Sequence, residues 1–463
     1  MDSLSTFATL FASFASVVTA PTAQSMAVLL RGAVLAPRAR TVTGCLVAAW
    51  PWVDKRWQSY SNVLRRAKMN MPQMARLLFE MILSLLPDDA PVYLAVDETL
   101  VRRWGRFVPA VGMHHDAVQS SHKRNVVNPG HKWVVLSVLI RLPCMNRPVA
   151  LPILSALYTA EKQAKHNYAE RLYRRHRTVP ELTLLLVRMV ARWVPQRHLI
   201  VVGDGAYATH NLARAFCPKS PYKTLRRTCL VSRFRFDAAT YGQADPCAGS
   251  AGRPRVKGQK LPSPGQIIQH ARPEDWQPAK IDWYAGSRKH VQLYTGTGLW
   301  YKSGLGAKTV RWVVVRDPAG ACRDEIFFTT APDLTPVEIV EMIVRRWSLE
   351  TTFQEMREHL GLETLRNWSR TAVGRSVPLL LSVYSLIVVW FSLEVDEPAG
   401  CRLSRPWYEK QHTTFSDMLE AARVDILSEL INDRPDPATP EHLFRLPHIS
   451  PTAAHPYVNR RAA

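Results

Sequence analysis

The stretch RRWSLETTFQEMREHLG, residues 345–361, places charged residues on the apolar side of a predicted helix. Thr335-Pro336-Val337-Glu338 reads as a capping box with proline at the first helical position, and Gly361 can end the helix. Between them the apolar residues recur at spacings of three, four and seven, the helical period. These residues are Ile339, Met342, Leu349, Phe353, Met356 and Leu360. We therefore predict one helix over about 335–361.

Three charged residues of this helix, Arg346, Glu350 and Arg357, fall within about 40° of one another at roughly 100° per residue. They share their sector with apolar residues meant for the core. One interpretation is an ordinary i,i+4 ion pair between Arg346 and Glu350 at the rim of a packed face. The other is that Glu350 lines a site for cations and that the arginines beside it bind an anion. The rest of the chain has to decide between them.

The composition points to a polyanionic partner. The chain has 463 residues, which is enough for two or more domains, a formal net charge of +22 and a pI near 10.0. Such an excess favours nucleic acid, because neutralising phosphates releases counterions. Most of the basic residues are arginine, which suits bidentate phosphate contacts but also fits a GC-rich genome. Seven scattered cysteines without a CxxC pair indicate reduced thiols in a cytosol.

Two apolar stretches resemble membrane-related segments. Residues 1–20 mimic a signal peptide but have no early Lys or Arg, so we expect an amphipathic first helix. Residues 378–391 are too short for a comfortable membrane span, so we expect a buried helix there. No basic amphipathic helix or anchor indicates a membrane partner.

The hydrophobic pattern changes several times along the chain. We expect a helical module over 1–88, which either binds DNA or caps the next domain. Buried strands are predicted over 91–100, 132–142, 147–154 and from 198 to Asp204, with a helix over 178–195. The resulting fold class is α/β, a mixed sheet with flanking helices. The predicted domains are 1–88, an α/β core over 89–231, a β-rich insertion over 232–332, core completion over 333–395, and a partly helical tail over 396–463.

Three acidic residues stand out by context: Asp97 lies in one buried strand, Asp204 ends another, and Glu350 sits on the inner face of the helix. Buried carboxylates need a cation or strong donors. Mg²⁺ prefers oxygen ligands and few protein contacts. Two such ions about 3.5–4 Å apart can support an in-line phosphoryl transfer. The argument rests on the three acids occurring together, since each alone has an ordinary structural explanation.

With these motifs the chain resembles DDE-type insertion-sequence transposases, whose ribonuclease-H-like core is interrupted by a β-rich insertion. Their signature Y-x2-R-x3-E-x6-K is matched at Arg346 and Glu350, whereas Arg357 replaces lysine and Ile343 replaces tyrosine. Further resemblances are VDETLVRRWGR around Asp97, VVGDGAY around Asp204, and RFRFDAATY at 233–241. The resemblance covers about 90–361, and the helical N-terminal module also fits it.

The resemblance implies metal-dependent nicking at the ends of a mobile element and transfer of the 3′-OH into target DNA, typically through a hairpin. It implies that Asp97, Asp204 and Glu350 hold two Mg²⁺ ions, for which Mn²⁺ would substitute. It also implies that the partner is double-stranded DNA, bound by a homodimer, and that the protein is cytoplasmic in a bacterium, on the nucleoid when bound. The expected DNA contacts are Arg346, Arg357, Arg253, Arg255, Lys257 and Lys260.

Alternatives remain open at this level. One alternative is a ribonuclease-H-like nuclease that cuts without integrating, and another is a catalytically inactive DNA-binding descendant of a transposase. His114, His115, His122 and His131 allow a zinc site, a DNA-contacting loop or plain structural roles. We expect Glu98 to point away from Asp97 and to be structural. Trp133, Trp300 and Trp312 are expected in the core, although a tryptophan of the insertion that stacks on a flipped base is also conceivable.

Overall fold

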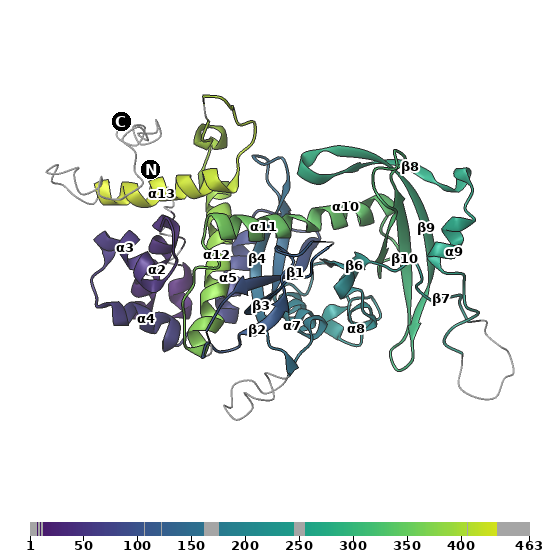
Figure 1. Ribbon diagram of the computed structural model, residues 1–463, viewed down its shortest axis with the longest axis horizontal. Helices are drawn as coiled ribbons and strands as arrows, with labels where there is room; N and C mark the ends of the chain where they lie inside the picture. Colours follow the sequence, from purple (N-terminus) through teal and green to yellow (C-terminus); the bar gives the residue numbers. More distant parts are fainter. Residues whose placement is uncertain are drawn as a thin grey trace. The chain divides into compact units, whose positions relative to one another are not determined.

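A computed structural model describes residues 7, 10, 13–105, 107–121, 123–161, 176–244, 255–404 and 406–432 (Figure 1). The chain divides into two compact units. Unit 1 comprises residues 1–85, 101–130 and 354–463, and unit 2 comprises 86–100 and 131–353. Strands β1 and β3 and helix α11 contribute residues to both units.

An eleven-stranded mixed sheet dominates the fold, with most of its strands in unit 2. Its order is β2-β3-β1-β5-β6-β11-β10-β9-β7, while β4 pairs with β3 and β8 pairs with β9. The strands are β1 Val92–Arg102, β2 Gly112–His115, β3 Val127–Arg141, β4 Pro148–Tyr158, β5 Leu199–Gly203, β6 Thr228–Arg233, β7 Thr240–Tyr241, β8 Gln277–Asp282, β9 Arg288–Lys302, β10 Gly306–Arg316 and β11 Glu325–Thr329.

The centre of the sheet is parallel, and its middle strand, β5, is completely buried. β5 pairs in parallel with β1 on one side and with β6 on the other. All five residues of β5 are buried, as expected for a continuous apolar run covered on both faces. The predicted strands at 91–100, 132–142, 147–154 and 198–204 are therefore confirmed.

The β-rich segment does not form a sheet of its own. β11 pairs antiparallel with β6, β10 with β11, and β9 with β10, so these strands extend the sheet that starts at β1. Trp312 of β10 and Trp133 of β3 are almost fully buried, as expected for core residues. Trp300 of β9 is half-buried and stacks on His210 with the ring centroids 3.8 Å apart.

Unit 2 also contains helices, the last of which, α11, is shared with unit 1. They are α7 Val179–Trp193, α8 His210–Ala215, α9 Pro264–Gln269, α10 Pro336–Arg346 and α11 Ser348–Glu358, with short 3-10 turns η4 Gly205–Tyr207, η5 Lys223–Leu225, η6 Pro273–Asp275 and η7 Tyr284–Gly286. Helix α10, labelled in Figure 1, packs on β5, β6, β8, β10 and β11. One apolar cluster joins α10 to the sheet, and it includes Ile200, Val202, Val231, Val313, Phe327, Ile339, Val340 and Met342.

The prediction of one helix over 335–361 is wrong in one respect. The Thr335 capping box with Pro336 does begin α10, but the helix ends at Arg346. Trp347 lies in a turn, and α11 restarts at Ser348. The apolar residues that the single helical wheel assigned to the core stay buried beyond this turn, among them Leu349, Phe353 and Met356.

Unit 1 gathers helices from both ends of the chain. They are η1 Ser13–Val17, α2 Ala20–Leu35, α3 Val42–Ala48, η2 Trp50–Trp52, α4 Trp57–Arg65, α5 Met71–Leu83, α12 Arg370–Glu394, η8 Pro398–Cys401 and α13 Phe415–Asn432. Helix α12 is long and apolar enough to cross a membrane by length and composition. However, 78% of its most apolar window is buried, because α2, α4, α5 and α13 pack against it. The predicted buried helix at 378–391 is confirmed.

Candidate active site

Asp97 and Asp204 lie on neighbouring parallel strands. The register pairs Val92 with Leu199 and Ala95 with Val202. Continued by two residues, it sets Asp97 level with Asp204, on strands that are typically about 4.8 Å apart. The first two predicted acids are therefore brought to the same place at the C-terminal end of β5.

The carboxylate of Asp97 is buried and has few donors. Its Oδ1 accepts the backbone N–H of Glu98 at 2.7 Å, and its Oδ2 accepts a guanidinium N–H of Arg346 at 2.7 Å. The pKa of Asp97 is raised to about 7, mainly by burial and with smaller contributions from the charges of Asp204 and Glu350, while Arg346 and the Glu98 N–H act to lower it. The negative charge at this position is thus incompletely compensated by the protein.

Asp204 is held at the end of β5 by local contacts. Its Oδ1 accepts the backbone N–H of Ala206 at 2.9 Å, and its carbonyl oxygen accepts the Ser232 hydroxyl at 2.5 Å. Gly203 is required here, since a Cβ at that position would lie 2.7 Å from the Cβ of the buried Tyr207. The strand end therefore packs closely against the following turn, which fixes the backbone of Asp204.

Arg346 joins Glu350 to Asp97. Its second terminal nitrogen donates to Glu350 Oε1 at 2.9 Å, so one guanidinium bridges two acids that are 253 positions apart in the sequence. The i,i+4 ion pair expected from sequence exists, and it is also part of the acidic site. Glu350 itself is not inward-facing as predicted, because its side chain is 46% exposed, compared with 14% for Arg346.

Tyr284 and Trp347 lie next to these charges and were not singled out from the sequence. Their rings meet edge to face with centroids 5.4 Å apart, and both are partly exposed. Burial and then the Glu325 charge raise the pKa of Tyr284, with smaller effects from Arg346 and Glu350. Only the position of Trp347 beside Arg346 could have pointed to this pair.

Glu98 has partners of its own. It forms an ion pair with Lys132, and the hydroxyl of Tyr207 lies 3.5 Å from its Oε1. Burial, followed by the charge of Glu98, raises the pKa of Tyr207 well above its usual value. The structural role predicted for Glu98 agrees with these contacts.

The donor set fits a hard divalent cation in type. Asp97 and Glu350 both pair with Arg346, Asp204 directly follows the strand beside Asp97, and burial raises the pKa of Asp97. The three are not pre-arranged as a cage, since no group of three or more His, Cys, Asp or Glu side chains in the described ranges has metal-holding geometry. Arg346 occupies the place between two of them.

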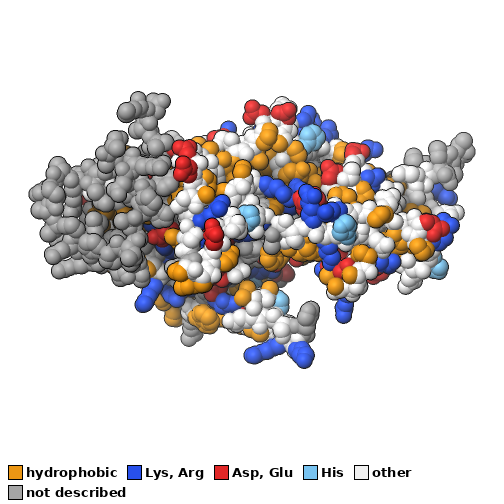
Figure 2. All heavy atoms as spheres, turned by 90° about the horizontal axis from the view of Figure 1, so that it is seen from above, with side chains coloured by type: hydrophobic (Ala, Val, Ile, Leu, Met, Phe, Trp, Pro, Cys, Tyr) orange, Lys and Arg blue, Asp and Glu red, His pale blue; other side chains and the backbone are white. Residues whose placement is uncertain are grey.

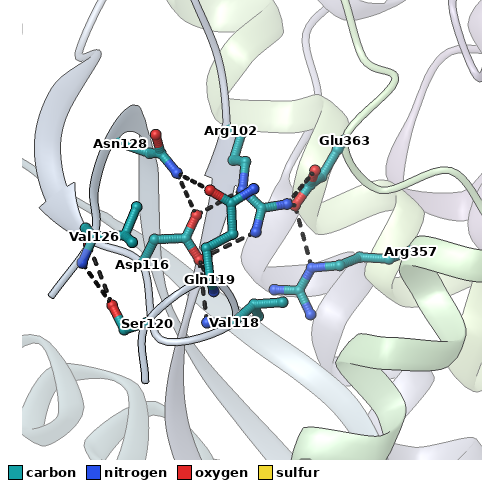
Figure 3. A network of polar contacts seen from close by, with 9 residues as sticks. All are labelled: Arg102, Asp116, Val118, Gln119, Ser120, Val126, Asn128, Arg357 and Glu363. Atoms are coloured by element: carbon teal, nitrogen blue, oxygen red, sulfur yellow. Dashed lines mark hydrogen bonds and ion pairs between the residues drawn. The ribbon is translucent and has the colours of Figure 1, made fainter. Parts of the chain in front are cut away.

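Arg357 lies in a different setting, shown in Figure 3. Its Nε donates to Glu363 at 3.2 Å, and Arg102 donates to both oxygens of Glu363 at 3.1 and 3.0 Å. Arg102 also binds the buried carboxylate of Asp116 through two hydrogen bonds of 2.6 and 3.1 Å. These residues all belong to unit 1. Whether Arg357 contacts DNA stays a prediction, but the side chain has an intramolecular ion pair.

The expected DNA-contacting residues at 253–260 differ in their surroundings. Arg253 lies outside the described residues, while Arg255 and Lys260 are exposed. Lys257 lies between the rings of Tyr241 and Tyr301, 3.7 and 4.2 Å from their centroids, which is a cation–π contact. Figure 2 shows Lys and Arg side chains gathered near the middle of the face that it presents.

The histidines of 114–131 form no metal site among the described residues. His114 and His131 are buried, His115 is exposed, and His122 lies outside the described ranges. The burial of His114 and His131 fits structural roles, and a DNA-contacting loop in this segment stays a prediction.

Comparisons with known proteins agree with the site. A family model described as DDE superfamily endonuclease matches residues 13–290, more than half of the chain. The matched range contains Asp97 and Asp204 and ends before Glu350. Comparison with curated proteins gave no match. Nucleases of this superfamily act on DNA and generally use divalent metal ions. By this match, and with a mixed α/β sheet that brings the first two acids together, the chain belongs to the DDE superfamily of endonucleases.

Proposed function

We propose that this protein is a transposase that moves an insertion sequence by metal-dependent cutting and joining of DNA. The observation that supports the proposal is that Arg346 pairs with both Asp97 and Glu350, while the strand register sets Asp204 level with Asp97.

The acids and the arginine have separate tasks in this proposal. Asp97, Asp204 and Glu350 would hold two divalent cations, Mg²⁺ or Mn²⁺. When bound, the cations activate the attacking water or 3′-OH and stabilise the leaving oxygen. Arg346 binds a phosphate of the scissile strand, because a guanidinium suits two parallel hydrogen bonds to phosphate oxygens. The backbone contacts of Asp204 hold one carboxylate at a fixed position on the strand end.

The remaining parts of the proposal follow from the family resemblance and the charge. The reaction would comprise nicking at the element ends, a hairpin step, and strand transfer into target DNA. The basic surface and the helices of 1–88 would bind double-stranded DNA, with two copies of the chain on one pair of ends. The protein would act in a bacterial cytoplasm, on the nucleoid.

A plasmid carrying the element ends tests the proposal. With Mg²⁺ or Mn²⁺, the wild type is expected to excise the segment and insert it into a second plasmid. Asp97→Asn, Asp204→Asn and Glu350→Gln should each lower cutting by at least about 10³-fold. Glu341→Gln is the matched control, because Glu341 lies on the preceding helix and pairs with Arg345 at 2.9 Å. It should retain cutting.

Two other outcomes would replace the proposal. Cutting without insertion would identify a nuclease that does not integrate. End binding without any cutting by the wild type would identify an inactive descendant of a transposase. Substantial nicking by Glu350→Gln would remove Glu350 from the metal site.

A further inference from the structure

The positively charged guanidinium of Arg346 lies between Asp97 and Glu350, where a metal cation would otherwise balance their charge. Its two terminal nitrogens lie 2.7 Å from Asp97 Oδ2 and 2.9 Å from Glu350 Oε1, and its side chain is 14% exposed. Both oxygens of Asp97 accept a hydrogen bond, since Oδ1 is used by the N–H of Glu98. A cation approaching Asp97 therefore competes directly with the guanidinium.

In this position Arg346 donates hydrogen bonds to both acids, but one of its own N–H groups remains without an acceptor among the residues described. Its Nε is buried and has no hydrogen-bond partner within the part of the chain that the structure describes. A guanidinium presents all its N–H groups in one plane, and a phosphate can take two of them side by side. The unused Nε–H is thus a donor that the intramolecular pairing leaves idle and a phosphate contact could use.

Local structure gives this side chain room to relocate. Arg346 is the last residue of α10, and Trp347 forms the turn before α11. Glu350 lies in the first turn of α11 with its side chain 46% exposed, so it can exchange partners without unpacking the core.

We propose that Arg346 is an internal counter-ion that closes the three-carboxylate site, and that divalent cations and Arg346 exclude each other from Asp97 and Glu350. Cation binding releases Arg346 from the acids and makes its guanidinium available to a phosphate of the DNA. The inference rests on the proposed function, because that function supplies the cation and the phosphate. Its consequence is that the arginine engages a backbone phosphate only when the site is loaded, so cation and DNA binding reinforce each other.

Calorimetric titration of the full-length, chelator-treated protein with Mn²⁺, without DNA, tests the exclusion. Arg346→Ala should bind Mn²⁺ more tightly than the wild type, by about tenfold, because two charge-assisted hydrogen bonds no longer have to break. Arg345→Ala is the matched control, since the neighbouring Arg345 pairs with Glu341 on the same helix. It should leave the Mn²⁺ affinity unchanged.

Thermal unfolding provides a second readout. In chelator, Arg346→Ala should unfold at a lower temperature than Arg345→Ala, because Asp97 and Glu350 lose their counter-ion. Mn²⁺ should then raise its unfolding temperature by more than it raises that of the wild type. Arg346→Gln keeps an uncharged donor on a shorter side chain, and its unfolding temperature in chelator should lie between those of Arg346→Ala and the wild type. It provides a test if the alanine variant does not fold.

The results separate this inference from the proposed function. Mn²⁺ affinity in Arg346→Ala or Arg346→Gln that is equal to or weaker than that of the wild type overturns the inference, provided that Asp97→Asn abolishes binding. Equal Mn²⁺ binding by the wild type and Asp97→Asn would instead overturn the metal site of the proposed function.

Discussion

Asp97 and Asp116 show how the number of hydrogen-bond donors around a carboxylate determines its pKa. Asp97 accepts two hydrogen bonds, and burial raises its pKa to about 7. Asp116 accepts five, from Arg102, Asn128 and two backbone N–H groups. Burial also acts to raise its pKa, but these donors outweigh burial and lower it to about 2. Asp116 is therefore a structural anion, whereas Asp97 still needs positive charge.

Asp116→Asn should lower the free energy of unfolding at neutral pH by at least about 2 kcal/mol, the equivalent of the difference between pKa 3.8 and about 2. Because the pKa of Asp116 is lowered in the folded state, its ionised form stabilises the folded protein above pH 3.8. This contribution is lost as the pH falls toward 2. The difference in unfolding temperature between the wild type and Asp116→Asn should therefore shrink between about pH 4 and pH 2.

Asp88→Asn serves as the control for this titration, because its side chain is exposed. It should show no such pH-dependent difference. A constant difference between the wild type and Asp116→Asn across this range would contradict the assignment of Asp116 as an ionised, hydrogen-bonded group.

At the scale of the elements, close packing behind the site matters as much as the acids. Strand β5 ends at Gly203, against the ring of Tyr207 in η4. Gly205 lies on the other side of Asp204 in the sequence, and a Cβ there would meet Arg233 at an ordinary 3.8 Å. The two glycines of VVGDGAY thus have different requirements for space.

Gly203→Ala should destabilise the protein by about 1–3 kcal/mol and weaken Mn²⁺ binding, because Tyr207 must shift and Asp204 moves with it. Gly205→Ala is the matched control and should leave both properties nearly unchanged. Thermal unfolding and Mn²⁺ titration of the two variants measure the effect. Equal behaviour of the two variants would show that the contact with Tyr207 does not position Asp204.

The elements also show where sequence reasoning succeeded. The continuous apolar runs predicted β1, β3, β4 and β5, and the capping box predicted the start of α10 at Pro336. The turn at Trp347 was missed because apolar periodicity continues across it, with Leu349 and Phe353 both buried. Glu350 keeps its i,i+4 ion pair with Arg346 across this turn, but its side chain is 46% exposed and does not face inward as predicted.

At the scale of the whole molecule, the order of the acids along the chain was predictable but their partner was not. Asp97, Asp204 and Glu350 were recognised from their context on strand, strand and helix. The bridge from Arg346 to Asp97 spans 249 positions, and no local pattern encodes such a contact. For the same reason, two other features could not be predicted from the sequence. One is that helices from both chain ends join in unit 1, and the other is that the insertion strands extend the main sheet.

The most direct test of the account is anomalous scattering from Mn²⁺ in crystals of the full-length protein. The account predicts metal density within about 2–2.3 Å of carboxylate oxygens from Asp97, Asp204 and Glu350 together, with Arg346 turned away from Asp97. Metal density that omits one of the three acids, or lies elsewhere while Arg346 keeps both ion pairs, would contradict it.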